Sequence, residues 1–322
     1  MKFGILGAGN IASTMARTIT QMEGIEAYAV ASRNLEKASA FAQEFGFLKS
    51  YGSYEELVLD PEVDIIYIAT PHSFHAEHAK LCINHGKNVL CEKAFTQNAA
   101  QAKEVLALAE EKGVFITEAI WTRYMPSRRL INEILESGIV GKPQSLYADL
   151  SYPIMHKSRI TEPSLAGGAL LDIGVYGLNF ASMAFGDDIK DVQTTSILSD
   201  KGVDMVLNTT IIYNDNKMAI IHSDARAASN REGAIYCENG YVVVENINNP
   251  EAILVYDKMH QLIKRVEVPE QITGYEYEVR ACEKALKEGK KECAEMPHTQ
   301  TIFMMELMDQ IRGIMGVKYP NE

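Results

Sequence analysis

Cysteine is scarce in this sequence, and its pattern excludes a disulfide framework. The 322 residues include five cysteines, an odd number whose spacings fit neither paired disulfides nor a zinc cluster. Reduced thiols of this kind are typical of the cytoplasm. The opening MKFGILGAGN lacks the apolar core of a signal peptide, and no apolar run approaches the roughly 18 residues that span a membrane. We therefore expect a cytoplasmic protein that does not cross a membrane.

Positive charge is also in short supply. The chain has 31 Lys and Arg residues against 43 Asp and Glu residues, which gives a net charge of −12. Such a surface repels phosphate groups, so we expect no nucleic acid and no anionic lipid as a partner. Hydrophobic residues, at 47%, are abundant enough for substantial cores, and the length suggests about two domains of ordinary size.

The first residues carry a dinucleotide-binding pattern. An apolar strand at 2–6 runs into Gly7-Ala8-Gly9-Asn10-Ile11-Ala12, and a helical pattern follows. In this G-x-G-x-x-A arrangement Gly7 permits the tight turn, Gly9 lets the backbone approach a pyrophosphate, and Ala12 lets the helix pack closely on the strand. Because the phosphates would meet the N–H groups of the helix N-terminus, we expect Gly7, Gly9, Asn10 and Ile11 to bind the cofactor.

The end of the second strand indicates which cofactor binds. A site that prefers NAD places Asp or Glu here to hold the ribose 2′-hydroxyl. This sequence has Ser32-Arg33-Asn34 instead, so no carboxylate repels a 2′-phosphate and Arg33 is suited to a bidentate contact with it. We predict NADP, with Ser32 and Arg33 as ligands. NAD is the alternative if Arg33 is only a solvated loop residue.

Strands and helices alternate through the first 120 residues. Near-continuous apolar runs predict strands covered on both faces, and the helical patterns between them predict right-handed βαβ units in one parallel sheet. After the first strand and helix, the predicted strands are 25–31, 63–69, 87–91 and 114–118, and the predicted helices are 35–45, 74–85 and 99–112. We assign residues 1–120 to a Rossmann domain.

Three histidines, His72, His75 and His78, suggest a metal site at first sight. In a helix each three-residue step turns the side chain by about −60°, so the outer two diverge. No carboxylate accompanies them, and hydride transfer to a nicotinamide needs no metal. We therefore predict no metal. Capping, packing or cofactor contact is the expected role of the histidines, and His75 is assigned to cofactor binding together with Thr70 and Pro71, which end the preceding strand.

An apolar strand ends abruptly at Glu92-Lys93. A charge at a buried strand end is costly unless it is paired or used. Either the strand simply reaches solvent here, or Lys93 lies at the carboxyl edge of a parallel sheet, where ligands of such folds bind. We favour the second interpretation, and we expect Glu92 to hold the adjacent loop or the cofactor ribose.

Strands in hairpin order follow Arg123 and predict a second domain at 121–322. The turns Asn214-Asp215-Asn216 and Glu238-Asn239-Gly240 indicate a mostly antiparallel sheet. Predicted strands are 145–152, 192–198, 205–213, 217–223, 233–237, 241–245, 252–256 and 262–268, with helices at 127–137, 275–288 and 301–315. The fold class is therefore α/β, a Rossmann domain plus an α+β domain for substrate binding and dimerisation. The sheet face that the helices leave uncovered predicts a homodimer or a dimer of dimers.

Several motifs together resemble the Gfo/Idh/MocA oxidoreductase family over essentially the whole chain. They are the glycine fingerprint, Ala69-Thr70-Pro71, Glu92-Lys93, and the run from Gly167-Gly168 to Asp172-Ile173-Gly174-Val175-Tyr176. Within that family, the stretch EAIWTRY at 118–124, and tyrosine in place of histidine at 176, are similar to the dimeric dihydrodiol dehydrogenase subgroup. The resemblance implies a large open sheet in the second domain, NADP as cofactor, and trans-dihydrodiols or certain sugars as substrates.

The same resemblance implies roles for two further residues and shows one departure. Trp121 and Arg123 are expected to line the cofactor and substrate cleft, with a domain-hinge anchor as the alternative for Trp121. Ala94 stands where the family has proline, which removes a constraint on the backbone after Lys93.

The family's substrate site contains Lys93 and Tyr176, whose chemistry suits alcohol oxidation. Such a reaction needs a group that exchanges the hydroxyl proton and a charge that stabilises the oxygen. We assign Tyr176 as the general acid/base and Lys93 as the charge that lowers its pKa, or the reverse. Asp172, four residues before Tyr176, either hydrogen-bonds a second substrate hydroxyl or caps a helix. Tyr176 is alternatively a packing tyrosine.

These residues predict an NADP-dependent oxidoreductase acting on a small-molecule substrate. It would transfer hydride between the nicotinamide and a secondary alcohol or carbonyl of a small polyol, sugar or trans-dihydrodiol. One rival hypothesis is a non-catalytic NADP-sensing regulator, which would need none of Lys93, Asp172 and Tyr176. The other is a sugar–sugar oxidoreductase that never releases its cofactor.

Overall fold

The computed structural model describes residues 1–320 and 322 and divides the chain into two compact units. Unit 1 consists of Met1–Tyr124 and Gln271–Met305, and unit 2 consists of Met125–Glu270 and Glu306–Glu322. The division therefore differs from the expected 1–120 and 121–322 mainly at 271–305. This segment joins unit 1 because it bonds to it directly: Thr273 Oγ1 lies 2.6 Å from Thr18 Oγ1, and the N–H of Ile116 donates to the carbonyl of Lys291 at 3.0 Å.

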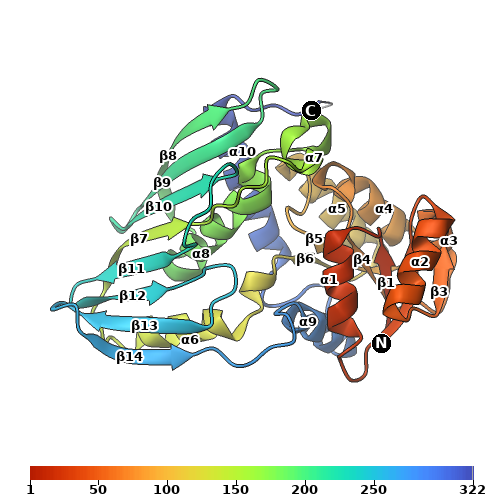
Figure 1. Ribbon diagram of the computed structural model, residues 1–322, viewed down its shortest axis with the longest axis horizontal. Coiled ribbons are helices and arrows are strands. Elements are labelled where there is room, and N and C mark those ends of the chain that lie inside the picture. Colours follow the sequence, from red (N-terminus) through yellow and green to blue (C-terminus); the bar gives the residue numbers. More distant parts are fainter. Residues whose placement is uncertain (321) are drawn as a thin grey trace. The chain divides into compact units, whose positions relative to one another are not determined.

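Unit 1 is built on a six-stranded parallel sheet in the order β3-β2-β1-β4-β5-β6 (Figure 1). The strands are β1 (Lys2–Leu6), β2 (Glu26–Ala31), β3 (Lys49–Tyr51), β4 (Ile65–Ile68), β5 (Asn88–Glu92) and β6 (Ile116–Ala119). From β1 the chain adds strands first on one side and then, at β4, on the other. Ligands of such sheets bind beyond the carboxyl ends of the strands at this switch point.

The helices of unit 1 begin and end at the residues that favour such positions. Asn34, Ser53 and Asn98 accept N–H groups at the starts of α2, α3 and α5, and Gly46 and Gly113 end α2 and α5 in the left-handed conformation. The helices are α1 (Asn10–Ile19), α2 (Leu35–Phe45), α3 (Tyr54–Leu59), η1 (His72–Phe74), α4 (His75–Asn84), α5 (Ala99–Lys112), η2 (Trp121–Arg123), α9 (Glu276–Lys287) and the start of α10 (His298–Met315). The short elements β3 and α3 were not predicted.

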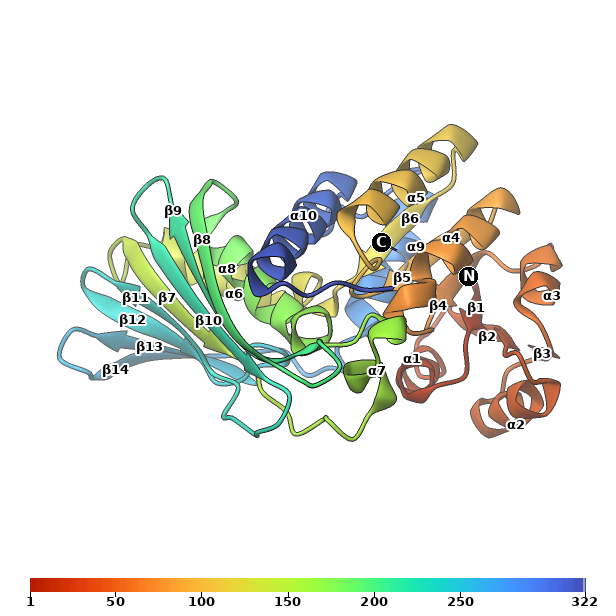
Figure 2. The ribbon, with the colours of Figure 1, turned by 90° about the horizontal axis from the view of Figure 1, so that it is seen from above.

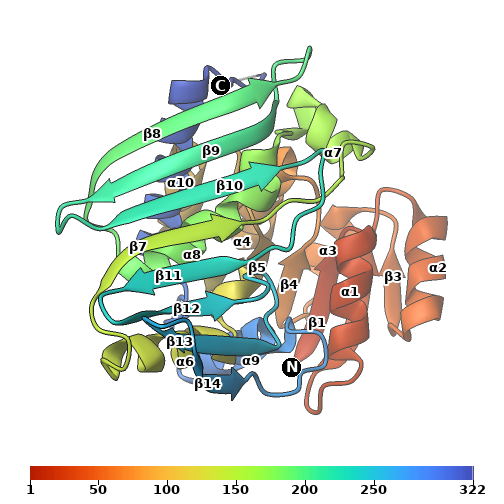
Figure 3. The ribbon, with the colours of Figure 1, turned by 60° about the vertical axis from the view of Figure 1, so that its left-hand side comes forward.

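Unit 2 contains an eight-stranded sheet in the order β14-β13-β12-β11-β7-β10-β9-β8 (Figure 3). Its strands are β7 (Pro143–Asp149), β8 (Ile189–Leu198), β9 (Asp204–Tyr213), β10 (Met218–Asp224), β11 (Gly233–Cys237), β12 (Gly240–Val244), β13 (Ala252–Asp257) and β14 (Leu262–Glu267). Only β7 and β10 pair in parallel, and the other neighbours are antiparallel. The expectation of a large, mostly antiparallel sheet is confirmed.

The longer helices of unit 2 lie on one face of this sheet (Figure 2). They are α6 (Pro126–Glu136), η4 (Leu170–Gly174) with α8 (Val175–Phe185), and the last part of α10, while the short α7 (Ser158–Thr161) and η3 (Pro163–Leu165) belong to the connection between β7 and η4. Gly177 lets α8 approach β10 closely, because a Cβ there would lie 2.5 Å from Ile221 Cγ2. The sheet face turned toward the viewer in Figure 3 carries no helix of this unit.

One stretch of unit 2 corrects the expectation about apolar runs. Pro163–Phe185 is long and apolar enough, by length and composition, to cross a membrane. In the structure 83% of its most apolar window is buried. The stretch, which contains η3, η4 and α8, therefore belongs to the core of unit 2, and its hydrophobicity follows from being covered on nearly all sides.

Candidate active site

The turn after β1 has the geometry that a pyrophosphate requires. Gly7 has φ of 107°, and a Cβ there would lie 3.0 Å from the carbonyl oxygen of Ala69. A Cβ at Gly9 would meet nothing within 4 Å, so the space above this residue is open. In the described structure no side chain caps α1, whose first turn holds the exposed Asn10 and the half-buried Ile11. The backbone N–H groups at the start of α1 suit a bound anion.

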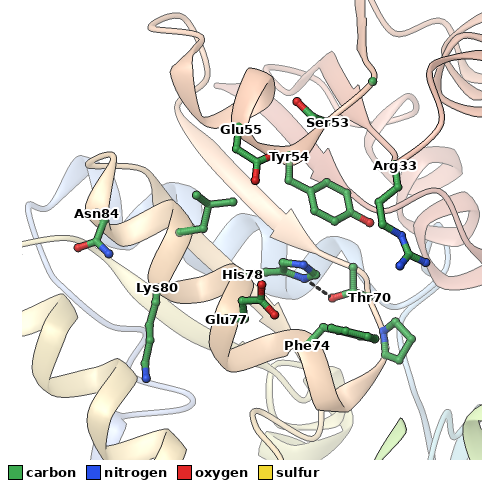
Figure 4. Close-up of a pocket in the computed structure, with 13 residues that line it drawn as sticks. Arg33, Ser53, Tyr54, Glu55, Thr70, Phe74, Glu77, His78, Lys80 and Asn84 are labelled. Carbon is green, nitrogen blue, oxygen red and sulfur yellow. Dashed lines mark hydrogen bonds between the residues drawn. The ribbon is translucent and has the colours of Figure 1, made fainter. Parts of the chain in front are cut away.

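A pocket of about 660 Å³ lies beside the ends of β2 and β4, lined entirely by unit 1 (Figure 4). Its lining residues are Arg33, Gly52, Ser53, Tyr54, Glu55, Thr70, Pro71, Phe74, Glu77, His78, Lys80, Leu81 and Asn84. The structure thus brings the predicted cofactor residues Arg33, Thr70 and Pro71 together. The predicted ligand Ser32 is buried, and its N–H donates to the carbonyl of Tyr51 at 3.2 Å.

Aromatic rings form the floor of this pocket. The His78 ring meets Tyr54 edge-on at 4.7 Å between centroids and stacks on Phe74 at 5.8 Å, while its Nδ1 lies 3.0 Å from Thr70 Oγ1. Burial, helped by the charge of Arg33, lowers the pKa of His78 to about 4, so the ring is neutral at pH 7. A flat, apolar wall beside an exposed guanidinium suits a purine ring next to a phosphate.

His75 has a different role from the cofactor contact that its sequence position suggested. It is 0% exposed, and its two ring nitrogens lie 2.8 Å from the carbonyl oxygen of Ala94 and 2.7 Å from that of Thr70. Burial lowers its pKa to about 4, so the neutral ring donates to only one of these carbonyls at a time. His75 therefore ties together the two loops that follow β4 and β5.

The end of β5 separates its acid from its base. Glu92 is 5% exposed and accepts a hydrogen bond from the buried Tyr67 hydroxyl, whereas Lys93 is half-buried. The Glu92 carboxylate also accepts the N–H of Lys93 at 3.2 Å. These bonds support the expected role of Glu92 in holding the loop, and its contact with the cofactor ribose stays a prediction. On either side of Ala94, the N–H of Lys93 donates to Glu92 and the N–H of Phe95 donates to Glu118.

Two further carboxyl groups lie near this strand end, and sequence reasoning did not find either. Glu118 Oε1 accepts the N–H of Phe95 at 3.2 Å, and burial raises the pKa of Glu118 to about 7. Glu278, on α9, is 0% exposed, and burial together with the charge of Glu92 raises its pKa well above the usual range. Neither Glu278 oxygen has a hydrogen-bond partner among residues 1–320 and 322. Glu278 gave no signal because α9 is distant in sequence from β5, whereas Glu118 opens the stretch EAIWTRY but received no role from it.

Trp121 and Arg123 are both buried in the structure. The indole of Trp121 is 5% exposed and stacks on Tyr275, with 4.3 Å between centroids and 10° between ring planes. One face of the indole is therefore already occupied within unit 1. Arg123 is 4% exposed, and its charge lowers the pKa of Glu118 against the larger effect of burial. Their predicted contact with cofactor stays a prediction.

In unit 2, Asp172 lies in the middle of the π-helical segment η4, and Tyr176 lies in the first turn of α8. Asp172 is 5% exposed and is held by Arg159, whose Nε and Nη2 donate to its two oxygens at 3.2 and 2.9 Å. Asp172 is therefore not a helix cap, and sequence reasoning missed Arg159. Tyr176 is 7% exposed. Since Lys93 belongs to unit 1 and Tyr176 to unit 2, their convergence on one oxygen stays a prediction.

A parallel Rossmann sheet with a glycine turn at β1, joined to a large antiparallel sheet, defines a two-domain dinucleotide-dependent oxidoreductase. Residues 1–119 match the model of an oxidoreductase family with an NAD-binding Rossmann fold, and residues 129–243 match the Gfo/Idh/MocA C-terminal domain. The chain belongs to the Gfo/Idh/MocA family. The resemblance drawn from its motifs is thereby confirmed.

Known relatives extend along the whole chain. It is 33% identical to trans-1,2-dihydrobenzene-1,2-diol dehydrogenase of Xenopus tropicalis, over 99% of both chains, and 30% identical to that of Homo sapiens, over 100% of this chain and 99% of the relative. Among solved structures, KijD10, a 3-ketoreductase from Actinomadura kijaniata in complex with NADP, superposes with a TM-score of 0.86 at 23% identity, covering 97% of each chain. Levoglucosan dehydrogenase in complex with NADH and L-sorbose gives 0.85 at 20% identity, covering 98% and 96%. These two structures support the fold.

Proposed function

We propose that the protein is an NADP-dependent dehydrogenase or reductase of a small polyol, sugar or trans-dihydrodiol. The observation that carries the cofactor assignment is the exposed Arg33 at the rim of the pocket after β2. The residues around it, Ser32 and Asn34, are neutral, so a 2′-phosphate meets a cation there and no carboxylate at the strand end. Glu55 and Glu77 also line the pocket, and their negative charge opposes a phosphate. The affinity for NADPH must therefore be compared with the affinity for NADH, which has no 2′-phosphate.

The substrate class rests on the relatives and on the residues that suit alcohol chemistry. The curated relatives are named as dehydrogenases of a trans-diol. A diol or a sugar presents two neighbouring hydroxyl groups, one to be oxidised and one to be held. Asp172, whose carboxyl group pairs with Arg159 at 2.9 Å, is suited to accept a hydrogen bond from the second hydroxyl.

We propose that Lys93 and Tyr176 handle the oxygen that reacts. A bound nicotinamide would accept the hydride during oxidation and donate it during reduction. Tyr176 takes the proton from the hydroxyl during oxidation and returns it during reduction. Lys93 orients the same oxygen and favours the phenolate form of Tyr176 through its positive charge. If Lys93 is the general acid/base and Tyr176 orients the oxygen, the same single proton is transferred.

The test is a substrate panel combined with two substitutions. Purified protein is assayed by NADPH absorbance against trans-diols, aldoses and inosose-type cyclitols. With the best substrate, Lys93→Met and Tyr176→Phe should each lower turnover by at least about 100-fold while NADPH still binds. The exposed Lys112→Met and the buried Tyr213→Phe serve as controls for loss of a lysine and of a tyrosine hydroxyl. Turnover within a few-fold of wild type in either site variant rejects its role, and an inactive panel with NADP binding intact favours the sensor hypothesis.

We further propose that the uncovered face of the unit 2 sheet pairs with a second copy of the chain. Tyr147, Met218, Ile220 and Tyr236 are between 36% and 45% exposed and lie on adjacent strands. In β7 the flanking Leu146 and Ala148 are buried, so Tyr147 points to the opposite face. An apolar sheet face of this kind suits a two-fold interface.

We also propose the cytoplasm as the location. All five cysteines are free thiols, and four of them are buried. This usage fits a reducing compartment.

A further inference from the structure

Asp204, the first residue of β9, is a buried carboxyl that none of the sequence motifs includes. It is 0% exposed, and its Oδ2 accepts the N–H of Leu170 at 2.6 Å across 34 residues of sequence. Leu170 is the first residue of η4, and the flanking Ala169 offers no side-chain cap. The start of this helix is therefore capped by a side chain from another element, which satisfies an N–H that the helix itself leaves unpaired.

The turn before η4 is built around this carboxyl. Gly168 has φ of 124°, and a Cβ there would lie 2.1 Å from Asp204 Oδ1. A Cβ at Gly167 would lie 2.6 Å from the carbonyl oxygen of Ile160. The Gly167 carbonyl in turn accepts a hydrogen bond from Tyr319 at 2.9 Å. Gly168 is required because a side chain there would push the Asp204 carboxyl away from the helix start, and Gly167 is required because a Cβ there would meet backbone carbonyl oxygens.

The charged and titratable groups that face Asp204 come from α10 and the C-terminal segment. Arg312 is 6% exposed and pairs with Asp309 at 2.6 Å and with Glu322 at 2.8 Å. Its guanidinium carbon lies 4.6 Å from the centroid of the Tyr319 ring. Burial raises the pKa of Asp204 to about 7, against the lowering effects of the nearby N–H groups and of Arg312. Asp204 Oδ1 has no hydrogen-bond partner in the described part of the chain.

We propose that Asp204 is a positioning residue of the active site, which fixes the start of the helix that carries Asp172 and Tyr176. The proposal rests on the function proposed above for those two residues. Asp172 is the second residue after Leu170, so a shift of the helix start moves its carboxylate directly. Tyr176 follows in the next turn of the same continuous helix. A displacement of about 1 Å in such a group costs on the order of 100-fold in rate.

The experiment compares two substitutions that differ only in whether they keep an acceptor. Asp204→Asn retains an oxygen for the Leu170 N–H, and Asp204→Leu has the same branching without one. Thr209→Val is the control, since Thr209 is also 0% exposed, lies on the same strand and pairs with Thr194 at 3.1 Å. We expect Asp204→Leu to lower kcat/KM by about 10- to 100-fold, and the other two to stay within about threefold of wild type. The Kd of NADPH should be unchanged in all three.

Hydrogen–deuterium exchange provides a readout that does not depend on catalysis. Asp204→Leu should speed exchange of the amides from Leu170 to Tyr176, whereas Asp204→Asn and Thr209→Val should not. Wild-type kcat/KM with unchanged exchange in Asp204→Leu overturns the proposal, and so does an Asp204→Asn variant as impaired as Asp204→Leu. If Asp204→Leu does not fold, Asp204→Ala is judged by the same two criteria. Failure of the proposed function looks different, because Tyr176→Phe then keeps its activity while exchange still upholds or overturns the cap.

Discussion

Replacing Glu118 with glutamine should change how the stability of unit 1 depends on pH. Burial raises the pKa of this carboxyl from 4.5 to about 7. Between these two values the folded chain holds a proton that the unfolded chain has lost, so the free energy of unfolding falls as pH rises through this window. Each pKa unit corresponds to about 1.4 kcal/mol, so ionising buried Glu118 costs on the order of 3 kcal/mol.

Glutamine removes the titration and keeps the hydrogen bonds. Its oxygen still accepts the N–H of Phe95, and its amide remains next to Thr301. We therefore expect Glu118→Gln to gain about 2 to 3 kcal/mol relative to wild type as pH rises from about 5 to about 8. The free energy of unfolding of Glu118→Gln must be compared with that of wild type at each pH. The reason is that burial lowers the pKa values of His75 and His78 to about 4, so the stability of both proteins rises over part of the same pH range.

The only tryptophan makes the assay specific. Trp121 lies in unit 1, three residues from Glu118, so its fluorescence during urea unfolding reports this unit. Glu111→Gln is the control, since that side chain is 69% exposed at the end of α5. A difference between Glu118→Gln and wild type that stays constant from acid to alkaline pH would refute the reasoning, because it would show that Glu118 titrates alike in the folded and unfolded chains.

Three further predictions concern the cofactor, the interface and the strand end. Arg33→Gln should weaken NADPH by about 10- to 100-fold and leave NADH nearly unchanged in fluorescence titrations; equal losses for both would contradict the 2′-phosphate assignment. Ile220→Glu should convert a dimer into a monomer by light scattering, and a monomeric wild type at micromolar concentration would contradict the interface. Tyr67→Phe removes a donor to buried Glu92 and should lower the free energy of unfolding by about 1 to 3 kcal/mol in urea, with an unchanged value as the opposing result.

Local signals in the sequence predicted much of the fold. The helix Ala99–Lys112 was predicted to the residue because Asn98 caps its start and Gly113 ends it. The strand Gly233–Cys237 was likewise correct, since a hairpin turn follows it directly. By contrast, β3 and α3 span only three and six residues, too few for a periodic pattern to emerge.

Contacts between distant segments escaped prediction. The segment 271–305 has an amphipathic helix, α9, but nothing in that pattern states which sheet the apolar side will cover. Arg159 and Asp204 were missed for the same reason: their partners, Asp172 and Leu170, are 13 and 34 residues away in sequence. Motifs placed Lys93, Asp172 and Tyr176 as candidates, whereas Arg159 and Asp204, which contact the residues around Asp172, belong to none of these motifs.

In each of the two units, a buried carboxyl group accepts a backbone N–H close to a candidate site residue. Glu118 accepts the N–H of Phe95, two residues after Lys93, and Asp204 accepts the N–H of Leu170, two residues before Asp172. Both carboxyls are buried, both have a pKa raised to about 7, and each has one oxygen without a hydrogen-bond partner in the described structure. At neutral pH each group is partly ionised, and burial of that charge lowers the stability of the unit, although the hydrogen bond to the backbone N–H itself stabilises the turn. Such a loss of stability is expected where a backbone turn positions a functional side chain, which is the role proposed here for Lys93, Asp172 and Tyr176.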